Sequence, residues 1–305
     1  MVVDDAPLIV VVGAEGNLGL RIVKALVRRG AKVRVITRPG KTDADMSAVS
    51  ALGVEIVAVD PTDAKAMAKA CAGSACVVSA LNGLGDVVID RQSVLLYAAV
   101  AAGVPRFIPS DFAADFTKSK PGLNRNFDLR RTFMARAGKA PIRVTSILNG
   151  AFIDMLGAEM PIIQRSIHRV LYWHESDQVL DFTTKDNMAD FPAAAALDPT
   201  TPRILRVAGD SISIRTLAAT LTEVTGQRYR PLWVGSLGML GVMIRLVKRF
   251  APEADAAFPA WQGMQYMRDQ FSGEVQLQRL DNARYPDIAW TSARDHLAGL
   301  EVLQD

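Results

Sequence analysis

The chain has 305 residues, of which 50% are hydrophobic and 22% charged, a composition typical of a globular protein and not of a disordered one. Its net charge of +3 is small for this length and no long block of like charges occurs, so the composition does not support nucleic-acid binding. No signal peptide opens the sequence and no apolar stretch is long enough to span a bilayer. We therefore expect a cytoplasmic protein that does not bind membranes.

The first half of the chain alternates strand and helix patterns. The expected strands lie at residues 8–12, 32–37, 54–59, 75–80, 106–109 and 142–148. The expected helices run from Leu18 to Gly30 and at about 44–52, 62–72, 86–102 and 125–137. This alternation predicts an α/β fold with a Rossmann-type, doubly wound parallel sheet. The ligand crevice of such a sheet lies at the carboxyl ends of the strands.

After Gly150 the alternation breaks down. Helical patterns occur at about 151–168, 186–197 and 213–226, with short strands at about 169–173, 179–183 and 203–208. We interpret this half as a smaller, irregular α+β substrate lobe. The expected domains are therefore residues 1–152 and residues 153–305, with some segments of the second part able to return to the Rossmann sheet.

The cysteines and histidines suggest no special chemistry. Cys71 and Cys76 lie on either side of an expected helix-to-strand turn, and we expect buried thiols of a reducing compartment without a disulfide. The three histidines show no ligand spacing, so no metal site is predicted.

Three glycines, Gly13, Gly16 and Gly19, stand between the first strand and the first helix. Glycines at this place permit a tight turn, let the backbone approach a pyrophosphate and let the helix pack on the strand. The helix N-terminus also offers unpaired N–H groups to an anion. The motif therefore predicts a dinucleotide site, and the alternative is a structural turn without a ligand.

The residues after the second strand indicate which dinucleotide is bound. A chain that binds NAD usually ends this strand with an acidic residue, which accepts hydrogen bonds from the ribose hydroxyls. Here Thr37 is followed by Arg38 and, after Pro39 and Gly40, by Lys41. A guanidinium suits the 2′-phosphate of NADP, and a lysine adds a point charge. We therefore predict NADP(H) as the cofactor; solvated turn cations are the alternative.

Two common catalytic arrangements are missing from the sequence. None of the five tyrosines is followed four residues later by a lysine, which excludes a short-chain dehydrogenase of the standard kind. No Gly-x-Ser-x-Gly nucleophile motif occurs either.

The chain resembles the isoflavone reductase-like and NmrA-like group of atypical short-chain dehydrogenases over nearly its whole length. The matching residues are Gly13, Gly16 and Gly19, Arg38, Gln92, the run 98–104, the segment 106–112, Leu129 to Arg131, 146–152, 186–190, 270–273 and 285–287. The Pro-Ser-Asp-Phe segment at 109–112 and the Tyr-Pro-Asp segment at 285–287 are the specific ones. The resemblance implies an NADPH-binding domain with a smaller substrate lobe.

The resemblance also implies roles for individual residues. The turn of Gly13, Gly16, Asn17, Leu18 and Gly19 would hold the pyrophosphate, with Arg38 and Lys41 at the 2′-phosphate. Ser79, Ala80 and Leu81 would line the adenosine and ribose side, and Ser110, Asp111 and Phe112 would lie near the nicotinamide.

Reductases of the family carry a catalytic lysine shortly before the Arg-Arg pair, and this chain has Asn126 there. Asparagine donates a hydrogen bond but is no general acid–base near neutral pH. A shift in the alignment would instead bring Lys118 or Lys120 into that role.

Phe152 and Met155 are the expected substrate-pocket residues, because they follow a strand end that would face the nicotinamide. The late segment with Met239, Met243 and Met267 either lines an aromatic pocket or forms ordinary core.

Three functions remain open at this point. The first is an NADPH-dependent reductase of a small aromatic, enone or quinone-like substrate, as a monomer or homodimer. The second is an NmrA-like NADP(H)-sensing regulator with a protein partner and little or no turnover. The third is a degenerate fold that holds no cofactor.

Overall fold

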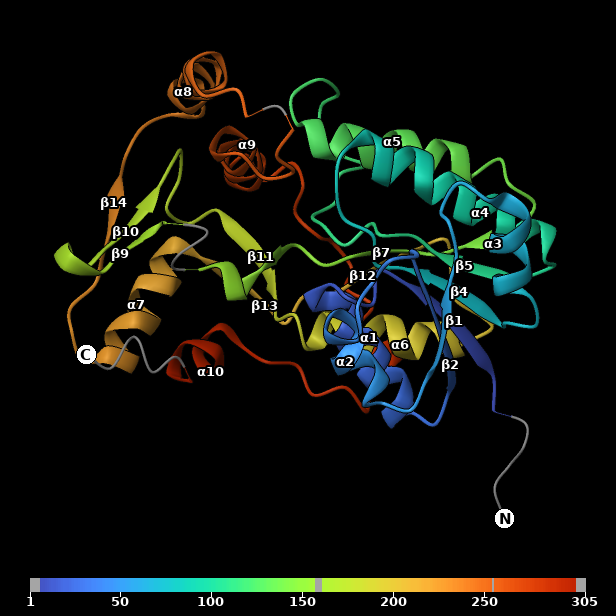
Figure 1. Cartoon of the computed structure of the whole chain (residues 1–305). Helices are drawn as coiled ribbons and strands as arrows, with labels where there is room; N and C mark the ends of the chain where they lie inside the picture. Colours follow the sequence, from blue (N-terminus) through green and yellow to red (C-terminus); the bar gives the residue numbers. More distant parts are fainter. Residues whose placement is uncertain (1–5, 157–160, 254, 300–305) are drawn as a thin grey trace. The chain divides into compact units, whose positions relative to one another are not determined.

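The structure, a computed structural model, describes residues 6–156, 161–253 and 255–299. Within these ranges the chain divides into two units (Figure 1). The first contains the residues up to Phe112 together with 129–147 and 188–205, and the second contains 113–128, 148–187 and the residues from Arg206 onward. Each unit is thus built from separated stretches. The sequence predicted a boundary at residue 152 and allowed segments of the second part to return to the Rossmann sheet. The cofactor and substrate roles expected for the two parts stay predictions.

The first unit is built on a parallel sheet. Its strands are β1 (Leu8–Val12), β2 (Lys32–Thr37), β3 (Glu55–Ala58), β4 (Cys76–Ser79), β5 (Arg106–Ile108) and β6 (Arg143–Val144). They lie in the order β3-β2-β1-β4-β5-β6, and all neighbours pair in parallel. Ile9, Val10 and Val11 of β1 are completely buried, as expected for a strand covered on both faces. The predicted α/β, Rossmann-type fold is confirmed.

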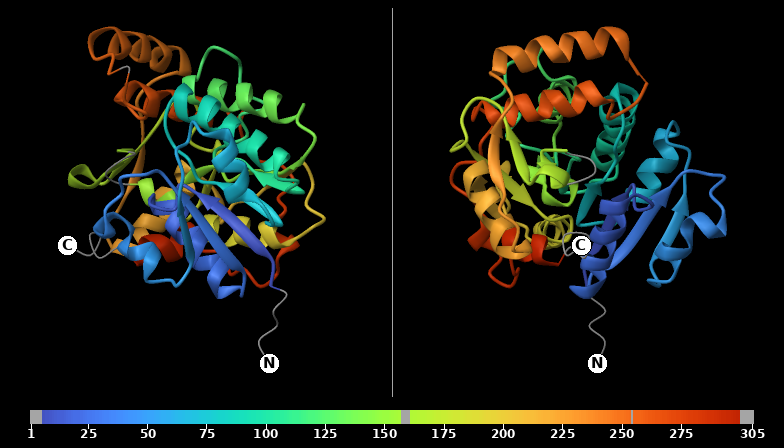
Figure 2. Two further views of the ribbon diagram at one scale, coloured as in Figure 1. Left: turned by 45° about the vertical axis from the view of Figure 1, so that its right-hand side comes forward. Right: turned by 90° about the vertical axis from the view of Figure 1, so that its left-hand side faces the viewer.

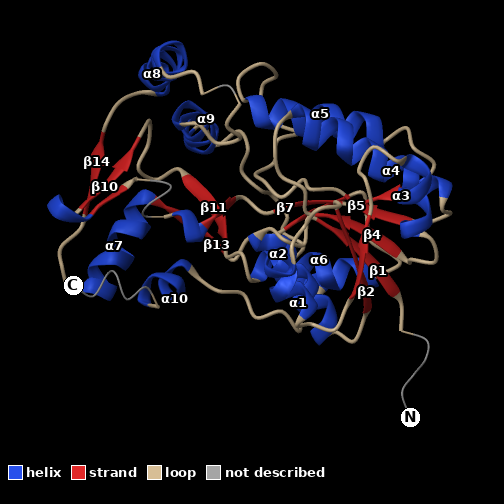
Figure 3. Ribbon diagram, in the orientation of Figure 1, coloured by secondary structure: helices blue, strands red, loops and turns tan. Residues whose placement is uncertain are grey.

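Helices cover both faces of this sheet (Figures 1 and 3). The helices are α1 (Asn17–Arg28), α2 (Asp43–Ser50), α3 (Ala64–Cys71), α4 (Gln92–Ala101), α5 (Arg125–Ala137) and α6 (Asn187–Leu197). A π-helical turn, Asp86–Arg91, precedes α4. The helices α1, α2 and α6 lie on one face and α3, α4 and α5 on the other. The buried guanidinium of Arg106 in β5 donates hydrogen bonds to the carbonyl oxygens of Ala195, Ala196 and Asp198, which holds the end of α6 on the sheet.

In the described ranges the second unit combines two small sheets with four α-helices (Figure 2). One sheet has the order β13-β11-β8, with β8 (Ala151–Phe152), β11 (Val179–Thr183) and β13 (Asp210–Ser213). The other has the order β14-β10-β9, with β9 (Ile163–Gln164), β10 (Arg169–Tyr172) and β14 (Arg230–Trp233). The helices are α7 (Ile214–Thr225), α8 (Leu237–Phe250), α9 (Ala260–Phe271) and α10 (Ala293–Ala298). This unit is the irregular α+β part that the sequence predicted.

Two expected elements differ in the structure. The helix predicted at 151–168 is wrong, because that stretch contains β8, β9 and two 3-10 turns, while residues 157–160 lie outside the described ranges. Ile153, Ile162 and Ile163 are buried, and pairing of β8 with β11 and of β9 with β10 decides the backbone. The strand predicted at 142–148 divides at Thr145. Its first part, β6, joins the large sheet, and its second, β7 (Ser146–Leu148), pairs with β12 (Ile204–Arg206).

Both cysteines are free, buried thiols, as predicted. Burial raises the pKa of Cys71 to about 11 and that of Cys76 to about 12, so neither forms a thiolate at neutral pH. None of the helices in the described ranges is long and apolar enough to cross a bilayer.

Candidate functional site

The glycine turn lies where three strands of the first unit end together. The register pairs Val12 of β1 with Ile36 of β2 on one side and with Ser79 of β4 on the other. The chain therefore leaves the sheet at neighbouring points after β1, β2 and β4. These are carboxyl ends on the two sides of β1, where a doubly wound sheet forms its ligand crevice.

Two of the glycines are required by close backbone contacts. Gly13 has a φ of +87°, and a Cβ on it would lie 2.7 Å from the carbonyl oxygen of Ala80. A Cβ on Gly19 would lie 2.0 Å from the carbonyl oxygen of Gly13, so a side chain there would drive α1 away from the turn. The glycines thus bring the turn against β4 and the helix against the turn.

The start of α1 is open to an anion. Gly16 occupies the position before the helix, and within the described ranges no side chain caps this helix end. The first N–H groups of a helix lack partners within the helix, and they carry the positive end of its dipole. Asn17 and Leu18 supply N–H groups of this kind at the predicted pyrophosphate position.

A cavity of about 440 Å³ lies next to this turn. Its lining includes Gly13, Gly16, Arg38, Lys41, Ala80 and Leu81 of the predicted cofactor residues. Asn17, Leu18, Gly19 and Ser79 are not part of that lining. Ser79 is completely buried, and its hydroxyl has no hydrogen-bond partner among the described residues. The structure thus brings the glycine turn and both predicted cations to one cavity.

The apolar wall of this cavity was not predicted from the sequence. The wall is formed by Ile36, Val59, Pro61, Met67, Val87 and Leu95. Apolar side chains of this kind suit a flat aromatic ring, while polar groups nearby fix its orientation. Arg91 and Asn82 supply polar groups to the same lining. Val59 and Pro61 come within three residues of the end of β3, so their place at a strand's carboxyl end was the signal that could have found them.

Glu15 is a further lining residue that the sequence did not single out. The hydroxyl of Thr37, the last residue of β2, donates a hydrogen bond to Glu15 Oε1. The end of β2 carries no acidic residue of its own, but the fold places a carboxylate from the glycine turn beside it.

Ser110, Asp111 and Phe112 follow β5 in the first unit and are buried. The backbone N–H of Ser110 donates to Gln92 Oε1 at 2.9 Å. Ser146 Oγ donates to Asp111 Oδ2 at 2.6 Å and accepts from Arg203 Nη1 at 2.7 Å. Burial raises the pKa of Asp111 above its ordinary value. None of these three residues lines the cavity, and their place beside a nicotinamide stays a prediction.

Asn126 lies in the second unit and is buried. Its Nδ2 donates to the carbonyl oxygen of Ala257 at 3.0 Å, and its Oδ1 accepts from Arg125 Nε at 3.2 Å. The guanidinium of Arg125 also lies 4.6 Å from the centre of the Trp261 ring. The amide of Asn126 therefore connects the start of α5 to the segment before α9, and its catalytic role stays a prediction.

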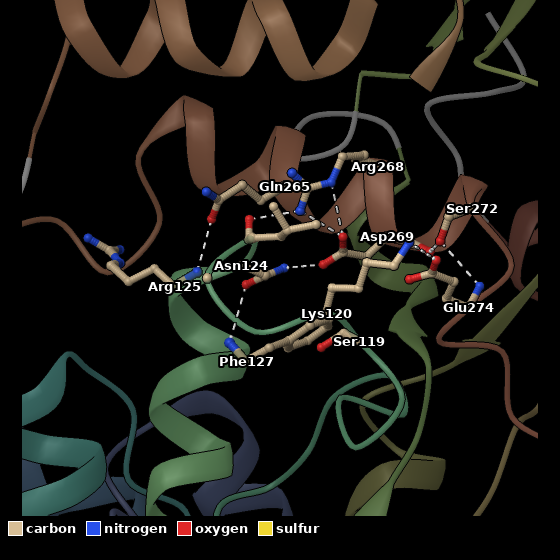
Figure 4. A network of polar contacts seen from close by, with 12 residues as sticks. Ser119, Lys120, Asn124, Arg125, Phe127, Gln265, Arg268, Asp269, Ser272 and Glu274 are labelled. Carbon is tan, nitrogen blue, oxygen red and sulfur yellow. Dashed lines mark hydrogen bonds and ion pairs between the residues drawn. The ribbon is translucent and has the colours of Figure 1, made fainter. Parts of the chain in front are cut away.

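The two lysines considered for the same role have partners in the second unit. Lys118 Nζ donates to the carbonyl oxygen of Gln276 at 2.8 Å, and it forms an ion pair with Asp115 Oδ2 at 3.5 Å. Lys120 forms an exposed ion pair with Glu274 at 2.8 Å (Figure 4). Surface pairs of this kind contribute little to stability.

The expected substrate residues, Phe152 and Met155, are half-buried in the second unit. A small apolar cavity of about 10 Å³ in this unit is lined by other residues, among them Met267 and Phe271. Met239 and Met243 are exposed on α8, so neither belongs to the core in the described structure, and a pocket role for them stays a prediction. The substrate role of Phe152 and Met155 stays a prediction.

No group of three or more metal-binding side chains comes together within the ranges described.

Comparison with known proteins gives consistent results. The family model described as the NmrA-like family matches residues 5–235. Pinoresinol reductase 2 of Arabidopsis thaliana is 27% identical over 208 residues, which cover 63% of this chain and 65% of that protein, slightly under two thirds of its length. Bifunctional pinoresinol-lariciresinol reductase 1 of Linum usitatissimum is 26% identical over 252 residues, covering 77% of this chain and 80% of that protein.

A solved structure described as AtPrR2 with NADP+ and (+)pinoresinol has the same fold. Its TM-score is 0.79 at 21% identity, and the match covers 96% of this chain and 98% of the other.

Proposed function

The chain belongs to the NmrA-like family, which confirms the resemblance found in its sequence, and from this premise we propose that it is an NADP(H)-dependent reductase. The proposed substrate is a small aromatic, enone or quinone-like compound. The observation that carries the proposal is the meeting of the glycine turn, Arg38 and Lys41 at one cavity.

The residues of the first unit fit a dinucleotide. The turn approaches β4 so closely at Gly13 that a Cβ would collide, and the open start of α1 suits a pyrophosphate. Arg38 and Lys41 provide the charges for a 2′-phosphate, and the apolar wall suits an adenine ring. The bound cofactor supplies the hydride of the reaction. The polypeptide binds and orients it.

The substrate class is supported by the relatives. Those reported above are named as reductases of pinoresinol and lariciresinol. We assign substrate binding to the second unit, with Phe152 and Met155 as the expected contacts. A monomer or homodimer in the cytoplasm is expected.

The second candidate is an NADP(H)-sensing regulator with little turnover. One observation favours it: the residue at the family's lysine position is Asn126, and both ends of its amide are bonded within the second unit. Asparagine cannot transfer a proton near neutral pH.

Two measurements test the proposal. Calorimetry with NADP+ should show binding to the wild-type protein, and Arg38→Ala should weaken it by about tenfold or more through loss of a charge-assisted contact. NADPH oxidation is then followed with a panel of aromatic enones, quinones and aldehydes. Oxidation with any of them supports the reductase. Binding without oxidation of NADPH by the whole panel favours the sensor, and absence of binding would overturn both.

A further inference from the structure

The carboxylate of Glu15 occupies the end of the cavity where an adenosine ribose is expected. Glu15 is half-buried in the turn between β1 and α1, and the buried Thr37 donates a hydrogen bond to its Oε1. Glu15, Thr37, Arg38 and Lys41 all line the cavity. Within the described ranges the second carboxylate oxygen, Oε2, takes part in no hydrogen bond, so it is available to a ligand.

The two dinucleotides differ in what they require at this place. NAD(H) presents ribose hydroxyls, which donate hydrogen bonds to a carboxylate at the end of the second strand. NADP(H) presents a 2′-phosphate, and a phosphate monoester carries a charge of about −1.5 to −2 at neutral pH. A carboxylate therefore attracts the ribose hydroxyls of NAD(H) and repels the 2′-phosphate of NADP(H).

The cations at this end of the cavity already have a carboxylate near them. Hydrogen bonds from Thr42, together with the nearby charges of Lys41 and Arg38, lower the pKa of Asp45 below its ordinary value. The attraction of Arg38 and Lys41 for a 2′-phosphate is thus opposed by Glu15 within the cavity and by Asp45 next to it.

We infer that Glu15 is a specificity-determining residue that lets this chain bind NAD(H) as well as NADP(H). Glu15 accepts a hydrogen bond from a ribose hydroxyl of NAD(H), and Arg38 and Lys41 bind the 2′-phosphate of NADP(H). Thr37 is a positioning residue that holds the carboxylate. The inference rests on the proposed function, because it assumes that the cavity takes a dinucleotide.

The test is the ratio of the dissociation constants of NAD+ and NADP+, measured by calorimetry for wild-type protein and Glu15→Gln. The glutamine keeps an oxygen that accepts the hydrogen bond from Thr37, so the turn is retained while the charge is removed. We expect NAD+ to bind about tenfold more weakly, since a hydrogen bond to a charged group is lost. NADP+ should bind more tightly, because repulsion of its 2′-phosphate is relieved.

Asp45→Asn is the matched control. It removes the same charge near the same two cations, but Asp45 is exposed and does not line the cavity. The ratio should then change by less than about twofold, because solvent screens an exposed charge. Thr37→Val is a second variant that keeps the carboxylate and removes the hydroxyl that holds it. It should weaken NAD+ binding more than NADP+ binding.

The outcomes separate this inference from the proposed function. If wild-type protein binds NADP+ but no NAD+ at millimolar concentration, or if Glu15→Gln shifts both constants by the same factor, the role of Glu15 is overturned while NADP(H) binding stands. If neither dinucleotide binds the wild-type protein, the proposed function fails, and this inference with it.

Discussion

Gly13 and Gly30 both adopt the left-handed backbone conformation, with φ of +87° and +75°, but their surroundings differ. A Cβ on Gly13 would collide with the carbonyl group of Ala80, whereas a Cβ on Gly30 would meet nothing within 4 Å. The requirement for glycine is therefore conformational at Gly30, and both conformational and steric at Gly13.

This difference predicts the effect of alanine at each position. Gly30→Ala should cost about 1–2 kcal/mol, the penalty of a left-handed alanine. Gly13→Ala should cost about 1–3 kcal/mol more, because the turn must move away from β4. Urea unfolding measures both values. Only Gly13→Ala should also weaken NADP+ binding; equal costs for the two variants would contradict the steric argument.

Asp111 makes a second prediction at the residue scale, because burial raises its pKa in the folded protein. The unfolded chain keeps the ordinary value of about 3.9 and releases this proton at lower pH than the folded chain does. The contribution of Asp111 to the free energy of unfolding is therefore fully present below the pKa of the unfolded chain. It is lost as pH rises through the raised pKa of the folded protein. Asp111→Asn lacks this dependence.

The measurement is the free energy of unfolding of both proteins from pH 4 upward. The value for Asp111→Asn minus that for wild type should increase with pH over the range in which the folded carboxyl ionises, and then become constant. Loss of the ionised partner of Arg203 changes the offset between the two curves but not this trend. A difference that does not vary with pH would show that Asp111 titrates normally.

At the scale of elements, the segment before α5 is tied to α9 by buried polar contacts (Figure 4). Asn124 Oδ1 accepts from the backbone N–H of Phe127, in the manner of a helix cap, and from Gln262. Asn124 Nδ2 donates to Asp269 at 2.8 Å, and Arg268 also donates to that carboxylate. One asparagine thus starts a helix and satisfies a buried carboxylate.

Asn124→Ala should therefore lower the free energy of unfolding by about 2–4 kcal/mol. The helix loses its cap, and the buried polar groups that bonded Asn124 are left without a hydrogen-bond partner. Thr42→Ala is the comparison. Thr42 forms a capping box with Asp45 at the exposed start of α2, so its loss should cost only about 1 kcal/mol. Urea unfolding of both variants checks the contrast, and a cost for Asn124→Ala no greater than that for Thr42→Ala would refute it.

At the scale of the whole molecule, all residues that line the 440 Å³ cavity belong to the first unit. NADP+ at about a hundred times its Kd raises the free energy of unfolding of the protein that binds it by about 2.7 kcal/mol. Hydrogen exchange should therefore slow in the glycine turn and in residues 36–41, 59–67 and 80–95. Exchange in α8 and α9 should change little. Equal slowing throughout both units would contradict a binding site confined to the first unit.

The sequence by itself determined the α/β order of the first unit, the glycine turn, and the cations Arg38 and Lys41 after β2. These features depend on neighbouring residues: alternating apolar runs, turn glycines and side chains that directly follow a strand. The family was equally readable, because its specific segments are short and contiguous. Asn126 at the family's lysine position was also visible from the sequence, although its function there is untested.

Only the tertiary structure decided the features that join distant segments. It brought Glu15 to the end of β2, formed the apolar wall from residues between Ile36 and Leu95, and paired β7 with β12 instead of extending β6. It also replaced the helix expected at 151–168 with short strands. The physical reason is the same in each case. A side chain's neighbours across a sheet, and the partner of a short strand, are set by long-range pairing and burial, which local periodicity does not record.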